Sequence, residues 1–421
     1  MIFKLAFKSL KNRKLTSSLT LLSISLGIAL FMGIEQVRLG VRESFSGAVS
    51  QTDLIVGARG GSLPLLLYSI FHIGNATNNL SYSSYQKFKK HPAVKWTIPL
   101  SLGDSHRGFR VVATDENFYR EYHYRGVGNI EFLNGRAASQ IWDVVLGYDV
   151  AHLLHYSVGQ QVTLSHGIAT DGANFYDHHD KPFHIVGILK KTATPLDRSL
   201  YITLEGMEAI HIDWKDGAPP IPGEETKPDQ IDPSKIKIGQ ITAFLLRAKS
   251  RIDALYLQRE INDFEGEPLM AIIPGVALAE LWGGLGYAED ALRVVSFFVI
   301  VASFLGMLVS LLTSLNERRR EMAILRSLGT SAFSIISLLV MEAVLLAFLG
   351  VLFGLLIDYG GLYLAQSSIA SVFGFFIPIH SPTLEQYCYL GILLLAAAFI
   401  GFIPALKAFK NSLTDGLSSK I

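Results

Sequence analysis

The sequence predicts an α-helical membrane protein with four transmembrane helices and one large α+β extracytoplasmic domain. Half of the 421 residues are hydrophobic and only 17% are charged, whereas about a quarter of the residues of a soluble protein are charged. The apolar residues are concentrated in four runs, each near the roughly 20 residues that cross a bilayer as a helix. About 250 residues separate the first run from the second, which is enough for a domain with its own core.

The four spans are expected at residues 15–38, 294–315, 332–357 and 386–404. Their central stretches carry no charge except in the third span, which contains Glu342. An acidic residue inside a membrane is costly, so it marks either a functional group or a carboxylate that faces the helix bundle. The sequence leaves both interpretations of Glu342 open.

The orientation follows from the distribution of Lys and Arg, which favour the cytoplasmic side. Residues 1–14, the connection 316–331 and the tail after Pro404 are rich in these residues, and the connection 358–385 has none. Both termini and the connection 316–331 are therefore predicted to be cytoplasmic, and the domain of residues 39–291 to be extracytoplasmic.

This orientation predicts the result of reporter fusions. At a site near Asp216, a reporter that works only outside the cytoplasm is expected to be active. After Ile421, a reporter that works only in the cytoplasm is expected to be active. Paired alkaline phosphatase and fluorescent-protein fusions measure this directly. If both positions report the same side of the membrane, the four-span topology is wrong.

Two features of the N-terminus allow more than one interpretation. Residues 1–14 place Ile2, Leu5 and Leu10 on one helical face with lysines elsewhere, which fits an interfacial helix or a solvated basic terminus. The first span follows a basic segment as a signal peptide would, but its apolar run is long and no Ala-x-Ala-like site follows. We therefore expect an uncleaved signal anchor.

The extracytoplasmic domain is expected to mix strands with helices, because runs of both periodicities occur in it. Strands are expected at residues 109–113, 144–146, 161–164, 184–189, 199–203 and 241–248, and helices at 83–90, 138–141, 148–154, 204–210 and 252–264. Residues 214–235 are rich in Pro, Gly and charge, which is typical of a loop insertion. The apolar run 63–73 fits either a core helix or a surface for lipid or a hydrophobic substrate.

Composition and motifs exclude several functions. A net charge of +1 gives no argument for nucleic-acid binding. The single cysteine, Cys388, lies in a predicted span, so no disulfide supports the external domain. Neither GxxxxGK[ST] nor the hydrolase motifs GxSxG and HExxH occur, so the chain is not expected to be an enzyme or to hydrolyse ATP itself.

Histidines cluster within the external domain. Six lie between residues 152 and 184, interleaved with aspartates, and imidazole with carboxylate suits zinc or a similar ion. The candidate ligands are His166, His178, His179 and His184. Their spacing matches no compact zinc motif, so an ordinary polar loop without any cofactor is the alternative.

The connection 316–331 reads NERRREMAILRSLGTS. It fits a short helix that docks in a groove of a partner, and equally a basic segment that only anchors the topology. The candidate docking residues are Glu317, Arg320, Glu321, Met322, Leu325, Arg326, Leu328 and Gly329.

Here the chain resembles a known family. This connection, continued by SAFSIISLLVMEAVLLAFLGVLFG, and the ending PALKAFKNSLTDGLSS resemble the FtsX-like permease domain. The segments NRKLTSSLTLLSISLGIALF, FLNGRAASQIWDVVLGYDVAHLLHYSVGQQVTL and FHIVGILKKTATPLDRSLYITLEG resemble the periplasmic core of macrolide-exporter-type (MacB-like) permeases. Those exporters carry a fused ATPase domain, which these residues lack.

The resemblance implies a permease subunit of an ABC transporter in the bacterial plasma (inner) membrane. It implies a separate ATPase subunit as partner, a second permease chain in a homo- or heterodimer, and contact with membrane lipid, and it allows a periplasmic or outer-membrane partner. ATP hydrolysis would move the spans and so act on substrate outside the membrane. The alternative within the same family is a mechanotransmitter that regulates an external enzyme or partner without transport.

Overall fold

The computed structural model describes residues 2–49, 51–126, 128–167, 177–214, 226–327, 329–373 and 377–414. The chain divides into two compact units, a helical unit of residues 1–40, 286–367 and 378–421 and a mixed unit of residues 41–285 and 368–377. The first corresponds to the predicted membrane part and the second to the predicted external domain. Each is described separately below.

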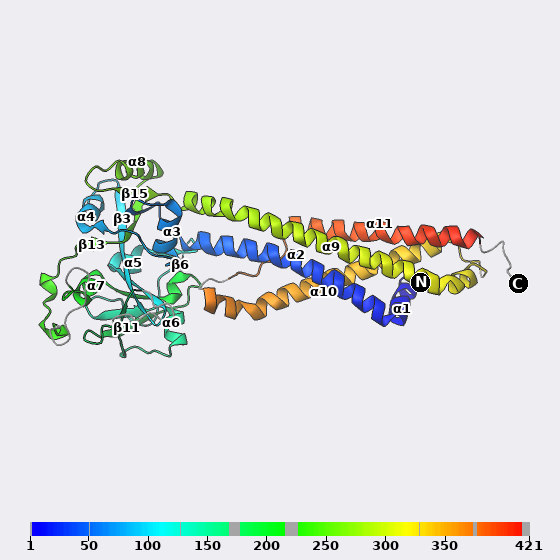
Figure 1. Ribbon diagram of the computed structural model, residues 1–421, viewed down its shortest axis with the longest axis horizontal. Coiled ribbons are helices and arrows are strands. Elements are labelled where there is room, and N and C mark those ends of the chain that lie inside the picture. Colours follow the sequence, from blue (N-terminus) through cyan, green and yellow to red (C-terminus); the bar gives the residue numbers. More distant parts are fainter. Residues whose placement is uncertain are drawn as a thin grey trace. The chain divides into compact units, whose positions relative to one another are not determined.

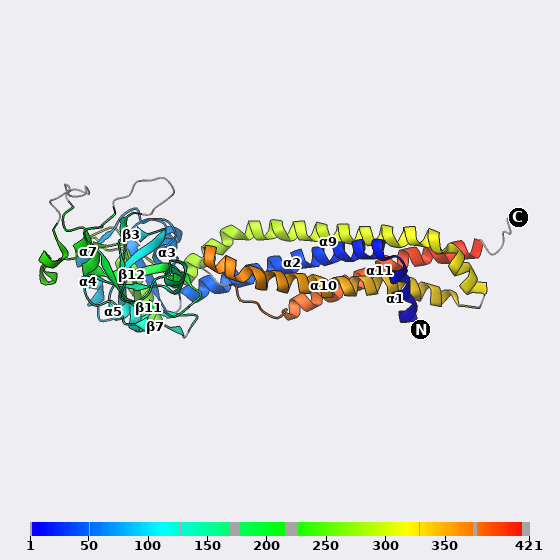
Figure 2. The ribbon, with the colours of Figure 1, turned by 90° about the horizontal axis from the view of Figure 1, so that it is seen from below.

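Four helices in the described part of the chain are long and apolar enough to cross a membrane. They are α2 (Lys14–Ala48), α9 (Pro274–Ser327), α10 (Ala332–Phe373) and α11 (Leu384–Thr414), and a short helix α1 (Ile2–Asn12) precedes them. Both views show α1 turned away from the axis of α2 (Figures 1 and 2). The predicted number and type of membrane elements are confirmed.

Small residues let the helices of this unit approach one another closely. An added Cβ at Gly350 of α10 would lie 2.4 Å from Cγ2 of Ile24 in α2, and one at Gly401 of α11 would lie 2.6 Å from Cβ of Ala343 in α10. Such close approach of backbones is the usual source of helix association in lipid, where apolar surface gains little from burial. Gly350 and Gly401 therefore lie on packing faces of α10 and α11.

Polar groups in the helical unit face its interior. Gln36 is buried, and its Nε2 donates to the hydroxyl of Tyr359 and to the carbonyl of His380, both at 3.0 Å. Glu342 is only 2% exposed and Asp358 only 6%. Of the two interpretations left open for Glu342, the structure agrees with a carboxylate that faces the bundle.

A mixed β-sheet, with both antiparallel and parallel strand pairs, forms the centre of the mixed unit (Figure 1). In the described residues it has eleven strands, in the order β15-β1-β14-β3-β4-β12-β8-β11-β7, with β10 added beside β3 and β9 beside β11. The strands are β1 (Leu54–Ala58), β3 (Val94–His106), β4 (Phe109–Thr114), β7 (Phe132–Gly135), β8 (Asp143–Leu146), β9 (Gln161–Val162), β10 (Ser165–His166), β11 (Phe183–Leu189), β12 (Ser199–Thr203), β14 (Ala243–Ala248) and β15 (Leu269–Ile272). Short pairs β2 (Leu80–Ser81) with β13 (Gln240–Ile241) and β5 (His123–Tyr124) with β6 (Gly128–Asn129) lie outside it.

Both faces of this sheet are buried, each under its own hydrophobic core. Successive residues of a strand point to opposite faces, and Val111 accordingly belongs to one core and Val112 to the other. The same alternation separates Leu200 from Tyr201. Because both faces are covered, the strands read as continuous apolar runs rather than as alternating ones.

Helices from both ends of the unit cover the two cores. Helices α4 (Tyr82–Lys89), α6 (Tyr148–Leu153), α7 (Leu204–Ile210) and α8 (Arg251–Asn262) contribute to the first, and α3 (Ser62–Ile70) and α5 (Glu116–Glu121) to the second. The apolar run 63–73 therefore forms a core helix, because Leu65, Leu66 and Ile70 are buried in the second core.

Two local predictions are wrong. Residues 138–141 are not helical; instead the backbone N–H groups of Ser139 and Gln140 each donate to Oδ2 of Asp143 at 3.0 Å, a local bond that competes with helix formation. Strand β3, at 13 residues the longest in the described sheet, was not anticipated, because Pro99 and Gly103 interrupt its apolar pattern.

The connection 316–331 is largely helical, as predicted, but it is not a separate short helix. Helix α9 continues without a break to Ser327, so that most of this segment extends the second span. No proline or glycine occurs between Ser314 and Leu328, and nothing in the sequence therefore ends the helix earlier. Helix α11 likewise continues past Pro404, the predicted end of the fourth span, to Thr414.

Candidate metal centre

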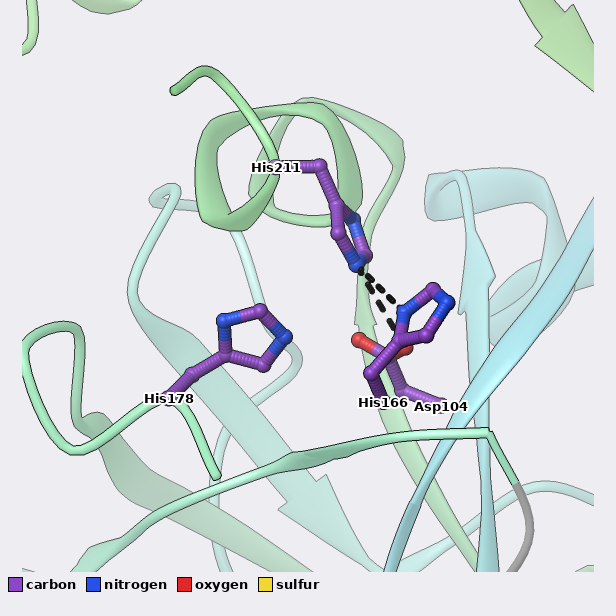
Figure 3. Close-up of side chains that lie close together, drawn as sticks. All are labelled: Asp104, His166, His178 and His211. Carbon is purple, nitrogen blue, oxygen red and sulfur yellow. Dashed lines mark hydrogen bonds and ion pairs between the residues drawn. The ribbon is translucent and has the colours of Figure 1, made fainter. Parts of the chain in front are cut away.

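Four side chains of the mixed unit gather around one point (Figure 3). They belong to Asp104, His166, His178 and His211, and one potential ligand atom of each lies within 4.8 Å of those of the others. Nδ1 of His166 lies 3.0 Å from Nε2 of His211 and 3.3 Å from Oδ1 of Asp104. The distance from Nε2 of His211 to the same Oδ1 is 3.6 Å.

Local backbone structure brings these residues together. Strand β10 pairs with β3 so that His166 stands directly opposite Asp104. The pairing of β3 with β4 shifts register between Leu102 and Ser105, and such bulges re-aim side chains next to functional sites. The backbone N–H of His178 donates to the carbonyl of Leu164 at 2.9 Å, which holds the third ligand beside β10.

His211 is fixed from the end of helix α7. It is the C-cap residue of α7, and its Nδ1 lies 3.0 Å from the carbonyl oxygen of Met207 one turn earlier. Because a carbonyl can only accept, this contact places a proton on Nδ1. In the neutral imidazole, Nε2 then carries the lone pair that faces Asp104 and His166.

The carboxylate of Asp104 is completely buried, at 0% exposure. Among the described residues, neither oxygen has a hydrogen-bond partner of normal geometry, although ring nitrogens of His166 and His211 lie 3.3 and 3.6 Å from Oδ1. Burial raises the pKa of this carboxyl, but the two imidazoles outweigh burial and lower its pKa to about 2. Asp104 is therefore a buried negative charge beside lone-pair donors.

The buried His178 and the partly buried His211 respond differently to this charge. Burial lowers the pKa of His178 to about 4 despite Asp104 nearby. Burial also acts to lower the pKa of His211, but its contact with Asp104 raises that pKa above the usual value. A neutral His178 is the form that can bind a metal.

A second layer of side chains holds the four residues in place. The ring of Trp214 packs against His166, with centroids 4.4 Å apart. Nζ of the buried Lys181 bonds Oδ2 of Asp180 at 2.8 Å and Oδ2 of Asp213 at 2.7 Å. This pair of bonds ties the loop that carries His178 to the loop that follows His211.

The structure separates the four histidines that the sequence indicated as ligands. His166 and His178 belong to the group, whereas the side chain of His179 is 78% exposed beside Asp177 and His184 is exposed on β11. The prediction missed Asp104 and His211. Asp104 could have been identified as a polar residue within an apolar strand, but the sequence pattern did not reveal β3. His211 lies 45 residues from His166, so no spacing in the sequence relates the two.

The predicted docking residues fall at the end of α9. The helix backbone includes Glu317, Arg320, Glu321, Met322, Leu325 and Arg326, whose side chains the structure does not describe. Leu328 lies outside the described residues. Gly329 has a φ of +87°, which glycine adopts without strain, and it begins the turn into α10.

Four helices able to span a membrane, together with a separate mixed α/β domain, define a multi-pass membrane protein. Residues 293–413 match the family model of the FtsX-like permease C-terminal domain, and residues 17–262 match that of the MacB-like periplasmic core domain. The second match alone covers more than half of the 421 residues. The chain therefore belongs to the family of FtsX-like permeases with a MacB-like periplasmic core domain, a family of ABC transporter components.

Two solved structures are similar to the mixed unit. The periplasmic region of MacB from Actinobacillus actinomycetemcomitans shares 13% identity at a TM-score of 0.35, covering 56% of this chain and 94% of that one. The extracellular domain of the noncanonic ABC-type transporter YknZ from Gram-positive bacteria shares 9% at a TM-score of 0.31, covering 52% and 99%. No curated protein sequence matches the chain at a significant level.

Proposed function

We propose that the chain is the permease subunit of an ABC transporter whose ATP hydrolysis is supplied by a separate ATPase subunit. The proposal places the chain in a bacterial inner membrane with both termini in the cytoplasm. Two permease chains pair, each recruits one ATPase, and ATP-driven closure of the ATPases moves the membrane helices. That movement drives substrate transfer or extrusion at the external domain.

The continuity of helix α9 carries this proposal. Near its start, Ala277 and Leu278 are buried in the second core of the mixed unit. The same helix then forms the second membrane span and ends in the basic segment that contains Glu317 and Leu325. At 1.5 Å per residue, the part of α9 within the helical unit, residues 286–327, extends over about 60 Å.

An unbroken helix is suited to mechanical coupling. Between Met307 and Ser327 it contains neither proline nor glycine, so a displacement applied near Leu325 meets no such hinge within that segment. The link between an ATPase on one side of the membrane and a domain on the other then needs no diffusible signal. This supports mechanotransmission over an ordinary channel.

The alternative function within the same family uses the same movement without transport. In that case the external domain would regulate an enzyme or another extracytoplasmic partner. Both functions require the ATPase subunit, and they differ in what binds outside. Identification of the proteins and small molecules that co-purify with the full chain from native membranes would distinguish them.

Co-expression with candidate ABC ATPase subunits from the same organism tests the shared part of the proposal. We expect the two proteins to co-purify in detergent, and ATP hydrolysis by the ATPase to rise several-fold when the permease is present in lipid nanodiscs. An ATPase subunit with a disabled nucleotide site provides the control for contaminating activity. Absence of both co-purification and stimulation would contradict the assignment of the chain as its permease.

A further inference from the structure

We propose that Asp104, His166, His178 and His211 bind one divalent transition-metal ion, with zinc as the best match, in a closed site with four protein ligands. The proposal concerns a site in the external domain and does not depend on the permease function. It replaces the ligand set that the sequence suggested, because His179 and His184 lie elsewhere. Three independent features of the structure support it.

The first feature is the geometry of the ligand atoms. Zinc lies about 2.0–2.1 Å from nitrogen and oxygen ligands in tetrahedral sites, so two ligands of one ion are about 3.3 Å apart. The three distances among Asp104 Oδ1, His166 Nδ1 and His211 Nε2 are 3.3, 3.0 and 3.6 Å. These three atoms therefore already form one face of the required tetrahedron.

The fourth ligand lies on the open side of this face. The ring of His178 is directed toward the other three residues from a separate loop (Figure 3), and one of its ring nitrogens lies within 4.8 Å of their ligand atoms. The ring is 1% exposed, so bulk water does not compete for this position.

The second feature is the hydrogen-bonding balance of the cluster. An oxygen and two nitrogens converge, but the Nδ1 proton of His211 points away from them toward Met207. Neither oxygen of the buried Asp104 has an aligned donor in the structure, although the two ring nitrogens lie 3.3 and 3.6 Å from Oδ1. A cation at the centre accepts a lone pair from each atom at once, and it neutralises a buried carboxylate that would otherwise be costly.

The third feature is the support around the ligands. Metal-binding histidines usually donate their second ring N–H to a carbonyl or carboxylate, which fixes the tautomer, and His211 makes this contact with Met207. Lys181 joins Asp180 to Asp213 and so fixes the two loops that carry His178 and His211. Trp214 covers one side of the site.

The ligand set selects the ion. Imidazole suits zinc, copper, iron and nickel, whereas calcium and magnesium require oxygen ligands. No sulfur belongs to the group, which disfavours copper(I). Four protein ligands leave no open position for substrate, so the site is structural rather than catalytic. It would connect β3, β10 and α7, which are separate in sequence.

The test measures zinc on the full-length chain purified in detergent. After loading with zinc and desalting, mass spectrometry of the metal is expected to find about one ion per chain. Asp104→Asn and His211→Ala should each weaken zinc binding by more than the 10–100-fold typical of losing an outer contact. His179→Ala and His184→Ala are matched controls and should bind as the wild type does.

Thermal unfolding gives a second readout. At a hundredfold excess of zinc over the dissociation constant, the wild-type melting temperature should rise by about 5–10 °C, and Asp104→Asn should show no rise. Cobalt gives a third readout that needs no variant, because a tetrahedral site produces an intense visible absorption. A folded wild-type chain that binds less than a fifth of an equivalent of zinc, an octahedral cobalt spectrum, or unchanged binding in both ligand variants would overturn the proposal.

Discussion

Replacing Met322 and Leu325 together by alanine is expected to abolish the stimulation of ATP hydrolysis that we propose for the permease. The two residues are three positions apart in helix α9 and therefore share a face. Truncation of a buried interface anchor costs more than about 1 kcal/mol, so the pair should weaken ATPase binding about thirtyfold or more. Co-purification and stimulated hydrolysis in nanodiscs measure the effect.

A change of charge on the same helix serves as the control. Arg326→Ala removes a long side chain that we assign to the rim of the interface, where truncation costs less. It should retain most of the stimulation. Both variants should insert and melt as the wild type does. If the double variant recruits and stimulates the ATPase at the wild-type level, the docking role of residues 317–329 is wrong.

Gly401→Leu is expected to destabilise the helical unit strongly. A Cβ at this position would lie 2.6 Å from Cβ of Ala343 and 3.2 Å from Cα of Val340, so helices α10 and α11 would have to separate. Overpacking of this kind typically costs about 1–3 kcal/mol. Here the obstructing atoms are backbone and Cβ atoms of helix α10, which cannot rotate away. Thermal unfolding in detergent measures the loss.

The same helix offers a matched control at Gly391. A Cβ there meets no described atom within 4 Å, and leucine favours helix more than glycine does. Gly391→Leu should therefore leave the melting temperature unchanged or raise it. Equal destabilisation by the two substitutions would show that the close contact between α10 and α11 does not support the bundle.

Much of the fold could be predicted because it is encoded locally. Strand β12 and helix α7 follow each other within Ser199–Ile210, and each shows the hydrophobic periodicity of its own type. Thr203 lies between them as the N-cap of the helix. Strand β3 could not be recognised in this way. It pairs with both β14 and β4, and these partners stabilise a segment that contains Pro99 and Gly103, two residue types unfavourable to a strand.

The limits of the membrane helices illustrate the same difference. Hydropathy located each span, but it did not show where the helices end. Helix α9 begins at Pro274, about 20 residues before the predicted span, and continues without a break into the segment that was expected to form a separate short helix. Hydropathy reports what contacts lipid, whereas helix ends depend on breakers and on packing beyond the membrane.

The sequence by itself determined the class of protein, its family and the number of its membrane helices. These properties depend on runs of apolar residues and on motifs that are continuous along the chain. The tertiary structure alone decided the composition of the candidate metal centre. Asp104 and His211 join His166 only because β10 pairs with β3 and α7 packs on the same sheet, and a ligand set assembled from distant segments leaves no spacing that a sequence pattern can record.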